Sequence, residues 1–271
     1  MEKLRWSAES SSQGAVPERF LMRLAAASPT LVSLPVIDLS RGRDEVRHAV
    51  LHAGKEIGFF QVINHGMPER TMREMEMASA AGESYSCHCL HLACHPVERT
   101  KPAWPEKPAG LRPALENFIV PARSIAMELL RLLCEGVGLR PDYFEGGLTG
   151  GDVEPIPGAL GISFGHQLEI ATNGALRSVE HRTVANAVVG RTSVAAIIMP
   201  TMDCVVGPAK ELVGEGRPAR YRSVAFRDFM HVYKTLGACK ESFEEALKIS
   251  PYQASSWYMG MDTTNEGRRV H

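Results

Sequence analysis

The sequence predicts an α+β fold, in which a mainly helical N-terminal region precedes a section of short strands. Apolar side chains recur at helical spacing over residues 43–57, and a second helical stripe runs over residues 121–137. After about residue 152 the pattern changes to short β-rich segments separated by turns, at residues 159–164, 178–186 and 191–199. Helices followed by strands are typical of an α+β arrangement, whereas a parallel α/β sheet requires the two to alternate.

Composition is that of an ordinary globular protein. The 271 residues include 30 basic and 31 acidic side chains, so the formal net charge is -1. This balance predicts neither a nucleic-acid partner nor a membrane partner. No apolar run reaches the length of a membrane span, the first 20 residues lack a secretory pattern, and the six cysteines form no evenly spaced disulfide framework. We therefore expect a reducing, cytoplasmic setting.

Local signals place the expected elements along the chain. Residues 1–30 are expected to form a loose leader, and residues 251–271 an unstructured tail. Residues 31–150 are expected to form a mainly helical domain, and residues 151–250 a domain of strands with a C-terminal helix. Besides the elements named above, we expect strands at 34–39 and 59–63, helices at 68–81 and 226–249, Pro121 in a first helical turn, and a hairpin-type turn at Asn173-Gly174.

Two short motifs carry side chains that bind metals or carboxylates. In the run SVEHR (residues 178–182), strand alternation puts Val179 and His181 on the same covered face. A histidine there is more often a hydrogen-bonded core residue than a metal ligand. Further on, Arg191 and Ser193 share one face of the next strand, so that a guanidinium fork and a hydroxyl can hold one carboxylate. Taken alone, such an arginine is more often a solvated surface residue.

Together, these motifs resemble those of the plant iron(II)- and 2-oxoglutarate-dependent dioxygenases. Residues 165–200 are similar to the C-terminal half of that family's catalytic core, in which a histidine in an SxxHR context precedes an RxS on the next strand. The runs LPVIDLS (34–40) and EIGFFQVINHG (56–66) resemble the family's N-terminal domain. Residues 130–147 and 218–234 resemble the branch that contains 2'-deoxymugineic-acid 2'-dioxygenase and hyoscyamine 6-hydroxylase.

The resemblance implies a jelly-roll (double-stranded β-helix) core that binds Fe(II) and 2-oxoglutarate. In the family, two histidines and one carboxylate hold one face of the iron, and 2-oxoglutarate and O2 take the open face. The products are succinate, CO2 and, for this branch, a hydroxylated small plant metabolite. His181 matches the second iron-binding histidine, whereas Arg191 and Ser193 match the pair that holds the distal carboxylate of 2-oxoglutarate. The expected partner is therefore a small-molecule substrate, and no pattern indicates an oligomeric state.

The chain departs from the family at the other two iron ligands. The family supplies them as His-x-Asp after an Asn-x-Tyr segment, but none of the ten histidines here is followed two positions later by Asp or Glu. Val153 is followed directly by Glu154, between which the family has that segment. We therefore expect an internal deletion there and a second, smaller one near residues 81–86, a truncated jelly-roll with unpaired strand edges, and impaired activity. Asp152 and His166 are candidate substitute ligands if the strands re-pair.

Three other interpretations stay open at this point. The chain is an active hydroxylase with an improvised iron site, a non-catalytic relic that binds 2-oxoglutarate or a metabolite, or an unstable mis-spliced fragment. Metal-binding side chains also gather between Cys87 and His95, although their spacing is not that of a zinc site. His65, in the INHG turn, is expected to be structural.

Overall fold

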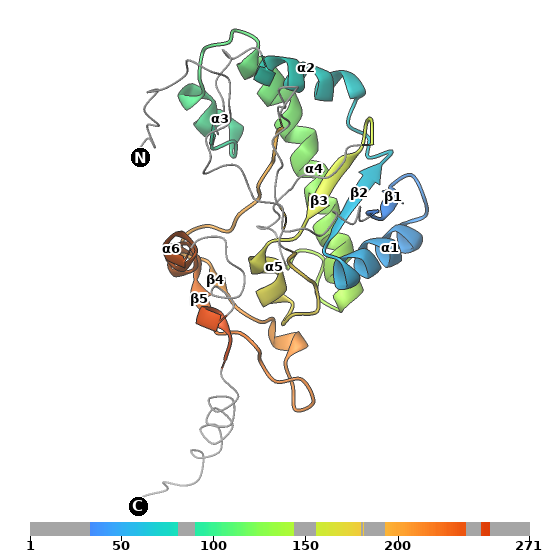
Figure 1. The fold of residues 1–271 in the computed structure, drawn as a ribbon, viewed down its shortest axis with the longest axis vertical. Coiled ribbons are helices and arrows are strands. Elements are labelled where there is room, and N and C mark those ends of the chain that lie inside the picture. Colours follow the sequence, from blue (N-terminus) through green and yellow to red (C-terminus); the bar gives the residue numbers. More distant parts are fainter. Residues whose placement is uncertain are drawn as a thin grey trace, which may run out of the picture. The chain divides into compact units, whose positions relative to one another are not determined.

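Figure 1 shows the computed structural model of the chain. The structure describes residues 33–80, 90–143, 156–179, 181, 193–236 and 245–249. The chain divides into two compact units. One consists of residues 1–33 and 184–191, and the other of residues 34–183 and 192–271. All helices and strands described below lie in the second unit. No helix in the described part is both long and apolar enough to cross a membrane.

A three-stranded sheet carries the N-terminal motifs. Strand β1 (Val36–Asp38) pairs in parallel with β2 (Phe59–Ile63), and β2 pairs antiparallel with β3 (Leu160–Ser163), so that β2 lies in the middle (Figure 1). Helix α1 (Arg43–Glu56) makes the crossover that a parallel pair requires. The first four residues of β2 are buried, as a near-continuous apolar run in a central strand predicts. The expected strands and helix of this region are confirmed.

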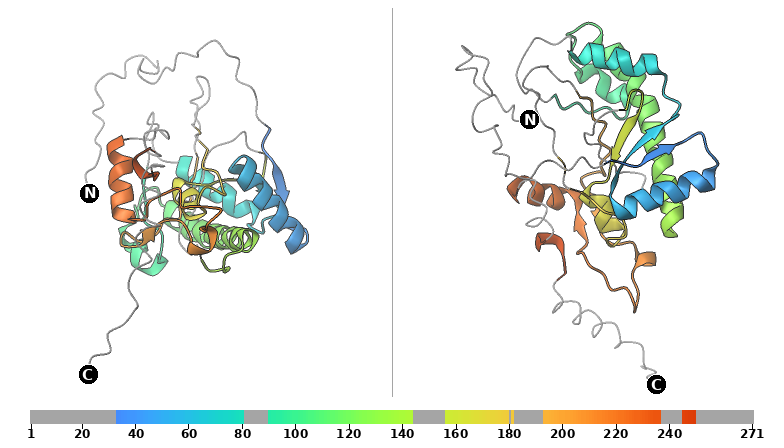
Figure 2. Two further views of the ribbon diagram at one scale, coloured as in Figure 1. Left: turned by 90° about the horizontal axis from the view of Figure 1, so that it is seen from below. Right: turned by 45° about the vertical axis from the view of Figure 1, so that its right-hand side comes forward.

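Helix α4 (Leu111–Val137) packs against both α1 and α2 (Glu69–Ala80). Together with α1 and β2 it builds the larger of the cores, which we call the first core. Its most deeply buried members, at most 1% exposed, include Val50, Phe60, Val62, Leu129, Leu130 and Leu133. The helix ends at Gly138, whose left-handed φ of 81° lets its N–H bond the carbonyls of Cys134 and Glu135. Figure 2 shows the same helices from two further directions.

Pro121 lies inside α4, so the prediction that it occupies a first turn is wrong. A proline in a helix interior removes one backbone hydrogen bond and normally disfavours the helix. Here the helix begins at Leu111, and its upstream turns bury Ala114, Leu115 and Phe118 in the first core. The burial of these three side chains outweighs the cost of the proline.

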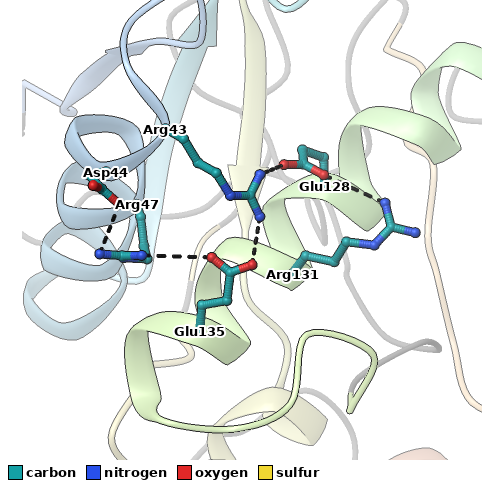
Figure 3. Close-up of polar contacts among 6 residues, drawn as sticks. All are labelled: Arg43, Asp44, Arg47, Glu128, Arg131 and Glu135. Atoms are coloured by element: carbon teal, nitrogen blue, oxygen red, sulfur yellow. Dashed lines mark hydrogen bonds and ion pairs between the residues drawn. The ribbon is translucent and has the colours of Figure 1, made fainter.

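An ion-pair network joins α1 to α4 (Figure 3). Arg43 donates to Glu128 and, at 2.6 Å, to Glu135. Arg47 lies 3.8 Å from the second Glu135 oxygen, and Arg131 lies 3.5 Å from Glu128. The hydrogen bonds from Arg43 to Glu135 and Glu128 raise the pKa of Arg43 above its ordinary value. Because the Arg43 side chain is half exposed, this network orients the two helices more than it stabilises them.

Shorter elements make up the C-terminal half around a second core. They are α5 (His166–Ala171), the antiparallel pair β4 (Val205–Val206) and β5 (Val224–Ala225), and α6 (Phe226–Leu236). The second core consists of Ile170, Val206, Tyr221, Phe226, Phe229 and Leu247. Single helical turns are α3 (Val97–Thr100), η2 (Lys101–Ala103) and η3 (Lys210–Leu212). Of the helix predicted at residues 226–249, the first part is confirmed as α6, residues 237–244 lie outside the described part, and Lys248 and Ile249 are not helical. Sequence periodicity predicted neither α5 nor the β4–β5 pair, which are too short to show a period.

The strand expected at residues 191–199 is absent from its described part, residues 193–199, where only Ile198 makes an isolated β-bridge. The side chains nevertheless alternate. Ala196 and Ile198 pack against the first core, whereas Ile197 and Met199 are each 48% exposed. The side chains of the inner face are therefore buried against the first core. The backbone of this segment, however, pairs with none of strands β1 to β5.

This exposed apolar face is expected to promote self-association. Replacing both Ile197 and Met199 with threonine keeps β-propensity but removes apolar surface, so aggregation during heating should decrease, as measured by light scattering. Ile198→Thr is the matched control, because it places a hydroxyl on the inner face and should instead lower the free energy of unfolding by about 1 kcal/mol or more. Equal effects of the inner and outer substitutions on aggregation would contradict the prediction.

Asp38 connects the end of β1 to the turn that follows β2. One of its carboxylate oxygens accepts hydrogen bonds from the Ser40 N–H at 3.0 Å, the Ser40 hydroxyl at 2.7 Å and the Asn64 side-chain amide at 2.8 Å. These donors, Asn64 foremost, lower the pKa of Asp38 below its ordinary value. The ionised carboxylate therefore contributes stability at neutral pH, and this contribution is lost as pH falls through the lowered pKa.

Asn64→Gly tests this link, because glycine tolerates the left-handed φ of 52° at Asn64 while removing the amide donor. The pKa of Asp38, followed by NMR, should rise toward its ordinary value of about 3.9. The variant should be less stable than wild type above about pH 5, and the pH-dependent part of that difference should vanish near pH 2. The entropic cost of the glycine does not depend on pH, so a difference that is constant from pH 2 to pH 7 would refute the link.

Candidate functional site

The histidine segment (residues 177–179 and 181) lies against the turn between α1 and β2. The Arg177 N–H donates to the Gly54 carbonyl at 2.9 Å, and its guanidinium donates to the Glu56 carbonyl at 2.8 Å. Gly58 has a left-handed φ of 78°, and a Cβ there would lie 2.0 Å from the Arg177 carbonyl oxygen. Only glycine therefore fits between the turn and the segment.

His181 is exposed, and its ring packs edge-on against Phe59, with 5.3 Å between ring centroids. Its Nδ1 lies 3.1 Å from the Val179 carbonyl oxygen. Because a carbonyl oxygen only accepts, neutral His181 carries its proton on Nδ1 and its lone pair on Nε2. A histidine that ligates a metal through Nε2 commonly has this arrangement, in which a carbonyl fixes the ring.

The strand expected at residues 178–186 is absent from its described positions, Ser178, Val179 and His181, and residues 182–186 lie outside the described part. The predicted placement of Val179 and His181 on a covered face is also wrong. Ser178 is buried, whereas Val179 and His181 are exposed. The reason is that the Ser178 N–H is bound by the Glu169 carboxylate, so a side chain supplies the acceptor expected from a neighbouring strand.

Helix α5 holds the histidine segment through Glu169. One Glu169 oxygen accepts the Ser178 N–H at 2.7 Å, and the other accepts the Tyr221 hydroxyl at 2.8 Å. All three residues are buried. No motif in the sequence pointed to Glu169. The available signal was an acidic residue between two apolar ones, Leu168 and Ile170, which are buried in the structure.

The Asn173-Gly174 turn ends α5, and the prediction of a hairpin there is wrong. Both residues have left-handed φ values, 53° and 78°, which suit a helix C-terminus as well as a hairpin. The Asn173 amide donates to the Pro218 carbonyl at 3.0 Å, and its oxygen accepts the Arg220 N–H at 2.8 Å. The turn thereby holds α5 beside the residues that lead to Tyr221.

The structure describes only one residue of the pair predicted to bind a carboxylate. Ser193 is exposed, and Arg191 lies outside the described residues, so their joint grip on a carboxylate stays a prediction. Asp152 also lies outside them, and His166 begins α5. Over the residues that the structure describes, no three His, Cys, Asp or Glu side chains are placed to hold a metal ion. These residues therefore do not fit the three-ligand Fe(II) site.

The other two histidine-containing motifs are the turn at His65 and the run from Cys87 to His95. His65 accepts the Met67 N–H at its Nδ1, at 3.2 Å, and its Nε2 lies 2.9 Å from the Gly158 carbonyl oxygen. This confirms a structural role, which links the turn after β2 to the approach to β3. Of the residues between Cys87 and His95, those up to 89 lie outside the described part, and the rest belong to no metal-binding group of described residues.

Comparisons with known proteins agree with these motifs. The family described as the N-terminal region of non-haem dioxygenases in morphine synthesis matches residues 34–81, and the 2OG-Fe(II) oxygenase superfamily matches residues 136–200. The 2'-deoxymugineic-acid 2'-dioxygenase of Hordeum vulgare is 38% identical, covering 82% of this chain and 91% of its own. The mugineic-acid 3-dioxygenase of the same plant is 36% identical, covering 79% and 88%.

A solved structure shares the fold. The crystal structure of JOX2 in complex with 2OG, Fe and JA superposes with a TM-score of 0.72 at 21% identity, covering 89% of this chain and 96% of that one. The expected α+β class with a truncated jelly-roll core is thereby confirmed.

The alignment with one barley relative also contains gaps in this chain. The barley 2'-deoxymugineic-acid 2'-dioxygenase aligns over 308 residues, whereas 82% of this chain of 271 is only about 222 residues. About 86 aligned positions, the difference between 308 and 222, therefore have no residue of this chain opposite them.

Gly58→Ala should destabilise the protein more than Gly66→Ala. Both glycines have left-handed φ values, 78° and 81°, so each substitution incurs a strain of about 1–2 kcal/mol. A Cβ at Gly66 meets nothing within 4 Å, whereas one at Gly58 meets the Arg177 carbonyl. Overpacking should add about 1–3 kcal/mol at Gly58 alone, measured by urea unfolding. Equal losses of unfolding free energy in the two variants would mean that the close approach of Gly58 to the histidine segment does not affect stability.

Proposed function

Since the chain belongs to the plant iron(II)- and 2-oxoglutarate-dependent dioxygenases, we propose that it is a member with impaired oxygenase activity. The family's cofactors are Fe(II) and 2-oxoglutarate. Bound together, these groups would supply an oxidative decarboxylation, in which one oxygen atom of O2 enters succinate as 2-oxoglutarate loses CO2 and the other enters a C–H bond of the substrate. The two barley relatives are named for mugineic acids, which supports a small plant metabolite as the ancestral substrate class.

The observation that carries the proposal is the absence of a His-x-Asp or His-x-Glu pair anywhere in the sequence. Two of three protein ligands are thereby lost, and a single imidazole is a poor Fe(II) site. The gaps of about 86 positions in the barley alignment support a deleted block, which the sequence locates between Val153 and Glu154. The described residues offer no substitute group of three ligands.

The chain retains the residues that match the rest of the site. His181 presents Nε2 as a free lone pair, because Nδ1 is engaged by the Val179 carbonyl. Arg191 and Ser193 match the residues that hold the distal carboxylate of 2-oxoglutarate, for which a guanidinium fork and a hydroxyl are suited. We infer that 2-oxoglutarate binding is better preserved than iron binding.

Anaerobic titration of purified protein tests the proposal. Fe(II) should bind weakly and only through His181, so His181→Ala should abolish it, while the exposed His48→Ala should not. 2-Oxoglutarate should still bind, and Arg191→Ala should weaken it, whereas the exposed Arg99→Ala should not. Succinate formation should fall at least about 100-fold below that of the barley relative, because loss of even an outer partner of a metal ligand costs about 10–100-fold.

Tight stoichiometric iron together with succinate formation at the rate of the barley enzyme would overturn the proposal. That outcome would require ligands besides His181, and two variants would test the candidates: Asp152→Ala, at a residue outside the described part, and His166→Ala, at the start of α5.

A further inference from the structure

We propose that Glu169 is the positioning residue for His181, through the hydrogen bond that it accepts from the Ser178 N–H. The inference rests on the proposed role of His181 as the remaining iron ligand. It assigns to this chain a contact between helix α5 and the histidine segment that does not depend on the missing ligands.

The contact is strong for its kind. The separation between the Glu169 oxygen and the Ser178 nitrogen is 2.7 Å, which is short for an N–H donor and typical of an ionised acceptor. Glu169 is 9% exposed and Ser178 is 4% exposed, so water competes little for either group. A buried backbone donor needs an acceptor, and here no strand supplies it.

Glu169 is itself held from the opposite side. The Tyr221 hydroxyl donates to its other oxygen at 2.8 Å, and Tyr221 is a member of the second core. Ile170, the next residue of α5, belongs to the same core. One Glu169 oxygen is therefore anchored to the second core, and the other binds the histidine segment.

The effect reaches the imidazole through the backbone. Ser178 is adjacent to Val179, and the Val179 carbonyl lies 3.1 Å from Nδ1 of His181. A carboxylate that holds the Ser178 N–H anchors the backbone one residue before Val179, and so limits the positions open to the carbonyl that sets the ring's tautomer and direction. Gly54, which accepts the Arg177 N–H, restrains the segment one residue earlier. These two hydrogen bonds anchor the backbone at Arg177 and Ser178.

Four variants separate positioning from general stability. Glu169→Ala removes the hydrogen bond from the Ser178 N–H and the one from the Tyr221 hydroxyl. Tyr221→Phe removes only the second of these. Glu169→Gln is the conservative rescue, because its amide oxygen can still accept the Ser178 N–H while its NH2 faces the tyrosine oxygen. Thr172→Val is the matched control: Thr172 is fully buried in the turn after α5, and its hydroxyl accepts the Leu176 N–H at 3.1 Å and donates to the backbone carbonyls of Leu168 and Glu169, leaving the two printed hydrogen bonds of the Glu169 carboxylate in place.

The first readout is amide hydrogen exchange measured by NMR, which needs no metal. Glu169→Ala should speed exchange of the Ser178 amide at least about tenfold, Tyr221→Phe less, and Glu169→Gln little. Thr172→Val should speed exchange at Leu176 and leave Ser178 unchanged. Unchanged Ser178 exchange in folded Glu169→Ala, or an equal increase in Thr172→Val, would overturn the inference.

The second readout is binding of Co(II), used in place of iron for its visible absorption. Glu169→Ala should weaken the His181-dependent signal about 10-fold or more, and Glu169→Gln should restore it. A signal unaffected by Glu169→Ala would overturn the positioning role. A wild-type signal equal to that of His181→Ala would instead overturn the proposed ligand, and the exchange experiment would then decide the Glu169 contact by itself.

Discussion

The close approach of the Arg177 backbone to the turn between α1 and β2 is the constraint on which the site depends. The turn can accept the segment only because Gly58 has no Cβ, and the Gly54 carbonyl is then free to bind the Arg177 N–H. The Gly58 carbonyl also accepts the Phe164 N–H at 3.1 Å, just after β3. One turn therefore joins the N-terminal sheet, the end of β3 and the histidine segment, which are distant in sequence.

The N-terminal half could be predicted from sequence because its signals are local. Val46, Val50 and Ala53 recur at helical spacing, and each is buried in α1. Strand β2 is an apolar, aromatic run next to a glycine, and it forms the centre of the sheet. Long elements with one apolar face are specified by residues a few positions apart, so tertiary context changes only their ends. The extension of α4 upstream of Pro121 is such a change.

The C-terminal half was harder to predict because its structure depends on contacts between distant residues. Apolar alternation around Ile198 has the period of a strand, but period alone cannot supply the partner that a ladder requires. The same limit explains Ser178, whose N–H is bound by a side chain and not by a neighbouring strand. His181 was identified by its motif, whereas Glu169 and Tyr221, which hold its segment, could be recognised only in three dimensions.

In this chain, the contacts that hold His181 are separate from the further ligands that a metal site would need. Among the described residues, His181 and its segment are held by the glycine turn, the Phe59 ring, the Val179 carbonyl and the carboxylate of α5. What a His-x-Asp pair would add is two further ligands, one of them a negative charge that offsets the charge of the metal. A neutral imidazole alone supplies geometry without that charge. The contacts of the histidine segment can therefore hold the Nε2 lone pair of His181 in place whether or not further ligands complete a metal site.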